Sequence, residues 1–172
     1  MKYKLLYLVL ITTVLIGCQL TGSKTFTSDE AGFSISFPGS PTQDAQNVNT
    51  PVGAIIMHTF MIEKSDSAYM VAYSDYPESL ANQTPPDVIL SGARDGAVAN
   101  VQGRLVSEIF ISLQGHLGRE ILIEAPAAEA FARVRIYLAG NRMYQIMALT
   151  STQQESLADE ITSYLNSFVI LE

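Results

Sequence analysis

The sequence contains no tryptophan, a single cysteine and two histidines, and its 10 basic residues are outnumbered by 17 acidic ones. One cysteine excludes an internal disulfide framework and any zinc site built from several thiolates. Two histidines far apart in the sequence argue against a histidine-rich metal centre. The formal net charge of −7 argues against a nucleic-acid partner, because phosphate contacts require clustered lysine and arginine. The sequence therefore predicts no metal, no cofactor and no nucleic acid.

What is present is a chain of globular composition. It has 172 residues, of which 48% are hydrophobic. That length suits one domain with or without a tail. An apolar content this high excludes a wholly disordered chain.

The N-terminus has the features of an export signal. Met1–Lys4 is basic, and Leu5–Ile16 is apolar apart from two threonines. This run is too short to span a bilayer, which needs about 20 residues, but it fits the hydrophobic region of a secretory signal. It ends in Leu15-Ile16-Gly17-Cys18, which closely resembles the lipobox of bacterial lipoproteins, where cleavage precedes a diacylated cysteine. The alternative is an ordinary signal peptide whose cysteine is incidental.

The lipobox implies three segments and a location. Residues 1–17 are the expected signal peptide, residues 18–28 the lipidated Cys18 and its tether, and residues 29–172 the folded domain. Loss of Lys2 and Lys4 from a chain of net charge −7 leaves −9. Anionic headgroups repel such a domain, so the acyl chains must hold it to the extracytoplasmic face, periplasmic or lumenal, of a cell-envelope membrane. The expected partners are the membrane, through the lipid, and an unidentified membrane protein.

Hydrophobic patterns predict strands separated mostly by tight turns. Strands are expected at 33–37, 54–63, 68–75, 104–113, 119–125, 131–139 and 142–149, with 42–50 an edge strand or a loop. Residues 87–100 are an expected helix, and Thr152–Glu155 fits the capping box of a second helix at the C-terminus. The segment 76–86, which contains three prolines, is an expected loop.

These elements predict an α+β fold. Tight turns make neighbouring strands antiparallel. Several strands carry apolar residues on both faces, so the sheet needs cover on both sides, which two helices provide. The first helix is expected to turn Ile89, Ala93, Gly96 and Ala97 toward the sheet. The prediction is an antiparallel sheet of about six to seven strands covered by helices.

Short features in a fixed order give residues 30–170 a resemblance to a known superfamily. They are GFSISFP at 32–38, SDYP at 74–77, ILSGARDGAVANV at 89–101, GRE at 118–120, RIYL at 135–138 with RMYQ at 142–145, and NSF at 166–168. Together they resemble the PsbP-like/DcrB-like superfamily, whose members share an antiparallel sheet between helices. The resemblance implies an α/β/α sandwich that acts as a scaffold or binding module, and it implies no reaction.

Few residues fit a catalytic role. A nucleophilic triad needs a histidine base, but His58 lies within a predicted strand, and His116, in a glycine turn, has no evident serine partner. Cys18, once acylated, cannot act as a nucleophile. No catalytic residue is therefore predicted.

The carboxylates have structural interpretations. Three of them lie near one loop: Asp75, Glu78 and Asp87. Solvation of the loop and capping of a helix is favoured there over a loose cation site. Glu120 and Glu124 share a strand face, and Arg133 and Arg135 lie on the next expected strand. This predicts cross-strand charge pairs, each contributing about 0.2–1 kcal/mol.

Three tyrosines are the candidate interaction surface: Tyr69, Tyr73 and Tyr76. Two of them alternate along an expected strand, and tyrosine is enriched at protein interfaces. The alternative is a core face whose hydroxyls reach its rim.

The sequence thus favours a lipid-anchored, extracytoplasmic, non-enzymatic module that binds or helps assemble a membrane complex. Two alternatives stay open. A small-ligand binding lipoprotein requires a concave pocket with converging polar side chains. An envelope hydrolase requires His58 or His116 within hydrogen-bond reach of a serine or carboxylate.

Overall fold

The computed structural model describes residues 24–50, 53–151 and 158–171, whose strands form two antiparallel sheets. The large sheet has seven strands in the order β3 (Thr42–Thr50), β4 (Gly53–Glu63), β5 (Ser67–Asp75), β9 (Arg142–Ser151), β8 (Ala130–Ala139), β7 (His116–Ala125) and β6 (Arg104–Leu113). The small sheet has the order β1 (Lys24–Ser28), β2 (Phe33–Phe37) and β10 (Val169–Ile170). The helices are α1 (Glu78–Gln83), α2 (Pro86–Asn100), α3 (Ala158–Asn166) and the short 3-10 helix η1 (Pro126–Ala128).

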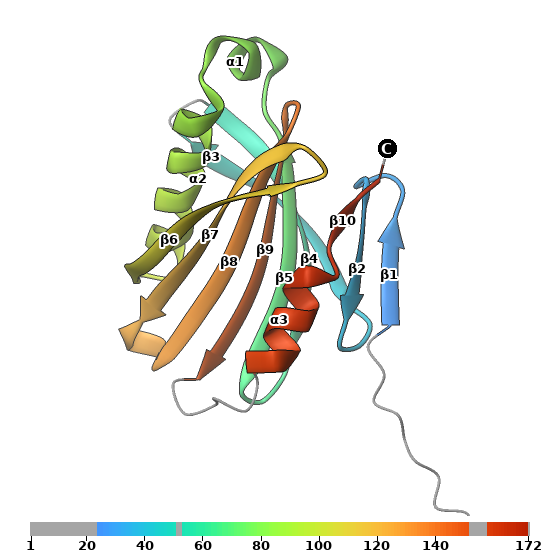
Figure 1. Ribbon diagram of the computed structural model, residues 1–172, viewed down its shortest axis with the longest axis vertical. Coiled ribbons are helices and arrows are strands. Elements are labelled where there is room, and N and C mark those ends of the chain that lie inside the picture. Colours follow the sequence, from blue (N-terminus) through green and yellow to red (C-terminus); the bar gives the residue numbers. More distant parts are fainter. Residues whose placement is uncertain (1–23, 51–52, 152–157, 172) are drawn as a thin grey trace, which may run out of the picture.

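The large sheet separates two cores. On one face α2 buries Ile89, Leu90 and Ala93 against the aliphatic side chains of β7 and β8. On the other face α3 and the small sheet enclose an aromatic core that includes Phe33 and Phe168 (Figure 1). Both faces are therefore covered, as the apolar residues on both faces of the strands require.

The predicted fold class is confirmed, but the number of sheets differs from the prediction. The strand Phe33–Phe37 belongs to the small sheet, which the sequence did not reveal. Its neighbour β1 lies within the segment 18–28 that was assigned to the tether. Phe26 of β1 packs on Phe33, Phe37 and Phe60 with ring centroids 5.2–5.9 Å apart, and these contacts make β1 part of the folded domain. Strand β10 has two residues, too few for a periodic pattern.

The helices also differ in detail from the prediction. The expected loop 76–86 contains α1, and α2 begins at Pro86 with Pro85 at its N-cap, so Asp87 does not cap it. Gly96 was expected on the inner face of α2 but is exposed, and no atom outside the adjacent helix backbone lies within 4 Å of a Cβ added there. The predicted signal peptide, Cys18 and the capping box Thr152–Glu155 lie outside the described residues. None of the described helices is long and apolar enough to cross a membrane.

The β6–β7 hairpin curls over the face that carries α3, and its tip approaches β10 (Figure 1). Gly118 permits this curl. It is paired with Tyr137, and an added Cβ would overlap the carbonyl oxygen of Ile136 and lie 2.5 Å from Cδ1 of Tyr137. At the tip, Gln114 bonds through its side chain to the backbone of Ile170. The hairpin thereby joins the two sheets.

Candidate functional site

Two surface cavities lie at opposite ends of β5. This strand runs from the start of α3 to the region of α1 (Figure 1). Tyr69, near its start, lines the first cavity, and Asp75, at its end, lines the second. We call them the α3 pocket and the β4–β5 wedge. One strand therefore contributes to both.

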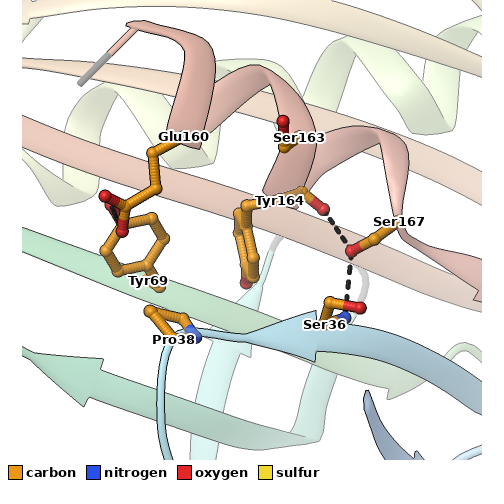
Figure 2. Close-up of a pocket in the computed structure, with 7 residues that line it drawn as sticks. All are labelled: Ser36, Pro38, Tyr69, Glu160, Ser163, Tyr164 and Ser167. Carbon is orange, nitrogen blue, oxygen red and sulfur yellow. Dashed lines mark hydrogen bonds between the residues drawn. The ribbon is translucent and has the colours of Figure 1, made fainter. Parts of the chain in front are cut away.

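The α3 pocket has a volume of about 270 Å³ and lies between α3, the end of β2 and β5 (Figure 2). Its lining residues are Ser36, Pro38, Tyr69, Glu160, Ser163, Tyr164 and Ser167. The Tyr69 hydroxyl donates a 2.8 Å hydrogen bond to Glu160, which also accepts a 3.0 Å bond from Nζ of Lys64. Ser167 accepts a 2.9 Å bond from the backbone N–H of Ser36, which ties α3 to β2.

Burial keeps the phenols of the α3 pocket protonated. Desolvation, reinforced by the bond to Glu160, raises the pKa of Tyr69 to about 12. Desolvation also raises the pKa of Tyr164 far above its ordinary value. Burial alone would raise the pKa of Glu160, but the bonds from Tyr69 and Lys64 outweigh it and lower that pKa. Among the described residues, the buried hydroxyl of Tyr164 has no hydrogen-bond partner. At neutral pH the α3 pocket thus contains neutral phenols and one ionised, partnered carboxylate, and its serine hydroxyls, from Ser36, Ser163 and Ser167, are the groups that could bind a small polar molecule.

The β4–β5 wedge forms where two neighbouring strands diverge. Their register runs from Glu63 opposite Ala68 to His58 opposite Tyr73 and stops there. Beyond it, β4 stays paired with β3, and β5 stays paired with β9 as far as Asp75. The resulting cavity, of about 360 Å³, is lined by Ala54, Ile55, Ile56, His58, Asp75, Tyr76 and Pro77.

Aromatic stacking and an ion pair close the narrow end of the wedge. The rings of His58 and Tyr73 stack with centroids 4.6 Å apart and 7° between their planes. The guanidinium of Arg142 lies 4.8 Å from the Tyr73 ring centroid and binds both carboxylate oxygens of Asp75, at 2.6 and 2.8 Å. The hydrogen bonds from Arg142 lower the pKa of Asp75, so this carboxylate is ionised at neutral pH. This pairing could not be predicted from the sequence, because 67 residues separate the two side chains.

The three candidate tyrosines do not share one exposed face. Tyr69 and Tyr73 are buried in the aromatic core, with exposed fractions of 0% and 5%, and half-buried Tyr76 packs on the other side of the sheet. The rings of Tyr69 and Tyr73 thus fit the alternative interpretation, a core face. Tyr69 and Tyr76 still line the two cavities, so a role in recognition stays a prediction for those positions.

Most of the residues considered for catalysis or cation binding make contacts that stabilise the fold. His58 stacks on Tyr73, and His116 is the half-buried first residue of β7. Asp75 binds Arg142, whereas Asp87 binds Arg119, so these two carboxylates serve different ion pairs. In the part of the chain that the structure describes, no three His, Cys, Asp or Glu side chains gather as a metal ion requires.

The predicted cross-strand charge pairs form in part. Glu120 accepts 2.6 Å hydrogen bonds from Arg133 and Arg135. These bonds outweigh the effect of burial and lower the pKa of Glu120. Glu124 instead pairs with Arg104, the first residue of β6. The contacts of Glu120 hold β7 to β8.

Sequence reasoning missed a buried cluster around Arg119. Its side chain is 4% exposed and binds Glu108, Asp87 and Ser91, with the ring of Phe110 4.9 Å from its guanidinium carbon. The sequence contained one indication of this cluster: Arg119 shares a strand face with Ile121 and Ile123, which are buried. An arginine on an apolar stripe requires an acidic partner. The cluster joins α2 to the β6–β7 hairpin.

Comparisons with known proteins identify the fold. No family model and no curated protein matches this sequence. Among solved structures, 19 chains match. The solution structure of cyanobacterial PsbP (CyanoP) from Synechocystis sp. PCC 6803 superposes with a TM-score of 0.61 at 10% sequence identity, covering 90% of this chain and 95% of that one. The protein PA94 of Pseudomonas aeruginosa, of unknown function, gives a TM-score of 0.49 at 11% identity, covering 88% and 99%. The chain therefore has the PsbP-like α+β fold.

Proposed function

We propose that this chain is a lipid-anchored, extracytoplasmic module that binds a partner or helps assemble a complex at a membrane, without chemistry of its own. The observation that carries the proposal is the position of Cys18, the one cysteine, directly after the apolar run and six residues before β1 begins at Lys24. Six residues of chain reach at most about 20 Å. A lipid on Cys18 would hold the domain against the membrane surface.

The place of β1 supports a defined orientation on that membrane. Lys24 pairs with Phe37, and the Phe37 ring lies 5.6 Å from the ring of Tyr164 in the α3 pocket. The tether would therefore leave the domain at the end that holds the α3 pocket. The wedge lies at the other end of β5 (Figure 1). A tethered domain would turn the wedge away from the bilayer, where a partner can reach it.

The contacts of the polar side chains support a binding role over a catalytic one. His58 is engaged by Tyr73, and the carboxylates of Asp75 and Glu120 are each held by arginine.

The test replaces Cys18 and follows the protein through membrane fractionation. The wild-type chain is expected in the membrane fraction, and Cys18→Ser in the soluble fraction or as uncleaved precursor. Thr21→Ser, three residues away, is the matched control and is expected to fractionate as wild type. Equal membrane association of Cys18→Ser and wild type would contradict the lipid anchor. Crosslinking of the membrane-bound protein, followed by identification of adducts by mass spectrometry, then tests for a defined partner.

The α3 pocket favours a second candidate function, a small-ligand binding lipoprotein. Its hydroxyls and its volume of about 270 Å³ fit a small polar molecule. Monosaccharides and free amino acids, added during thermal unfolding of the full chain, should include one that raises the midpoint for wild type and not for Ser163→Leu. Absence of any such shift contradicts binding of these two ligand classes.

A further inference from the structure

We propose that the β4–β5 wedge binds an extended peptide segment of a partner protein, which adds as a strand to β4 and directs a basic side chain toward Asp75. The inference rests on the proposed function, since it names the kind of partner that the module holds. Four observations carry it: an unpaired edge, the cavity beside it, the side chains that line it and their charge.

The first observation is the edge of β4. Its pairing with β5 begins only at His58, although β4 begins at Gly53. Among the described residues, Ala54–Met57 have no strand partner on the side toward β5, while β3 occupies their other side. A strand edge without a partner presents backbone N–H and C=O groups that can pair with another chain.

The second observation is the cavity beside this edge. Four residues of strand extend about 13 Å at 3.3 Å per residue. The cavity of about 360 Å³ lies between Ala54–Ile56 on one side and Asp75–Pro77 on the other. The β3–β4 hairpin crosses the large sheet obliquely (Figure 1), so this gap results from the twist of the hairpin away from β5. The space thus lies where an added strand would run.

The third observation is the pair of side chains that an added strand would meet. Because His58 is opposite Tyr73, continuation of the register would place Ile56 opposite Asp75, on the same face. Ile56 is 53% exposed, and the Asp75 side chain is 47% exposed. Lysine and arginine combine an apolar stem with a charged end. Such a side chain can cover Ile56 and reach Asp75.

The fourth observation is the charge around the wedge. Asp75 is ionised, and its two bonds to Arg142 leave further acceptor sites on its oxygens. Glu78 follows the lining residue Pro77 by one position, and the whole chain carries −7. A basic peptide is therefore favoured over an acidic one.

Strand β6, one of the two edge strands of the large sheet, is a weaker site for strand addition, although Ile109 and Phe110 are exposed on it. Its register shifts between Leu105 and Ser107, and Glu108 points inward to Arg94 and Arg119. Bulges and inward charges are features that protect sheet edges from pairing. This strand instead provides the control position, because Ile109 is 55% exposed, close to the 53% of Ile56.

The experiment uses the full-length chain and two fluorescent octapeptides with blocked ends, one of alternating valine and lysine and one of alternating valine and glutamate. Fluorescence anisotropy measures their affinity for wild type, Ile56→Lys and Ile109→Lys. The lysine peptide should bind wild type and Ile109→Lys alike and bind Ile56→Lys about tenfold more weakly. The glutamate peptide should bind wild type about tenfold more weakly than the lysine peptide does. Hydrogen exchange of wild type should slow at Ala54–Met57 when the lysine peptide is bound.

Three results would overturn the inference: no binding of the lysine peptide to wild type, equal affinity for the two lysine variants, or equal affinity of wild type for the two peptides. Equal thermal midpoints of Ile56→Lys and Ile109→Lys show that both fold, and the exchange measurement on wild type does not depend on either variant. Suppose that Cys18→Ser is lost from the membrane and that wild type captures a partner by crosslinking. If Ile56→Lys then captures the same partner equally well, the wedge is excluded as its binding site, whereas the proposed function stands.

Discussion

The side-chain amide of Gln114 makes two hydrogen bonds, each of 2.9 Å, to the backbone of Ile170. Its Nε2 donates to the carbonyl oxygen, and its Oε1 accepts from the N–H, so the amide acts as a strand partner would. Gln114 lies in the β6–β7 turn of the large sheet, whereas Ile170 belongs to the small sheet. One side chain therefore links the two sheets, and β10, with only two residues, depends on it and on β2.

Replacement of Gln114 by alanine should destabilise the protein by about 1–3 kcal/mol, because two hydrogen bonds of about 0.5–1.5 kcal/mol each are lost. Urea unfolding of the full chain measures the change. Gln102→Ala is the matched control, since Gln102 also has a positive φ, of 49° against 51°, and an exposed side chain. Equal losses in the two variants would show that the backbone conformation, rather than the link to Ile170, accounts for the effect.

Gly118→Ala should cost about 1–3 kcal/mol, the usual effect of overpacking, because the added Cβ meets the backbone of Ile136 and the ring of Tyr137. Gly96→Ala, within α2, should instead stabilise by about 0.5–1 kcal/mol, since no atom lies near its Cβ and alanine favours helix. Thermal and urea unfolding distinguish the two outcomes. If Gly118→Ala leaves the free energy of unfolding unchanged, β7 must be able to move away from Tyr137 without loss of stability.

The sequence predicted those elements whose pattern is local. Alternation along Phe33–Phe37 and Arg104–Leu113 located both strands, and the break between the strands expected at 131–139 and 142–149 located the turn between β8 and β9. It did not predict which sheet Phe33–Phe37 joins, because that depends on contacts with distant rings. The bounds of strand β1 were not predicted, because its one large apolar residue, Phe26, gives no periodicity.

The sites were predictable only in part. Tyr69 and Tyr76 were selected as recognition residues and line the two cavities, but the sequence could not tell that the Tyr69 ring is buried. The wedge itself was not predictable, because an apolar run such as Ala54–Met57 fits a fully paired strand equally well. Whether β5 follows β4 to its end depends on the relative twist of the strands, which single-strand patterns do not contain.

Arg119→Met should destabilise the protein by about 2 kcal/mol or more, because Glu108, whose side chain is 19% exposed, keeps only Arg94 as a partner, and Asp87 and Ser91 lose their bonds to Arg119. Arg104→Met is the matched control. Its side chain is 71% exposed and pairs with Glu124 at the surface, where an ion pair contributes about 0–1 kcal/mol. Urea unfolding at neutral pH measures both. A loss for Arg119→Met no larger than for Arg104→Met would contradict a structural role for the buried cluster.

The stability contributed by Glu120 should depend on pH. Hydrogen bonds from Arg135 and Arg133 outweigh burial and lower the pKa of this carboxyl in the folded protein. A lowered pKa stabilises the fold at pH values above the unfolded pKa of about 4.3. This contribution is lost as the pH falls through the lower, folded pKa.

Glu120→Gln should therefore be less stable than wild type at pH 7, and the difference should shrink between pH 5 and about pH 3, as urea unfolding at each pH would measure. Glu63→Gln, at an exposed position where β4 ends, is the control for the loss of one surface carboxylate and should be nearly as stable as wild type at pH 7. A deficit of Glu120→Gln that stays constant from pH 7 to pH 3 would assign its effect to packing rather than to charge.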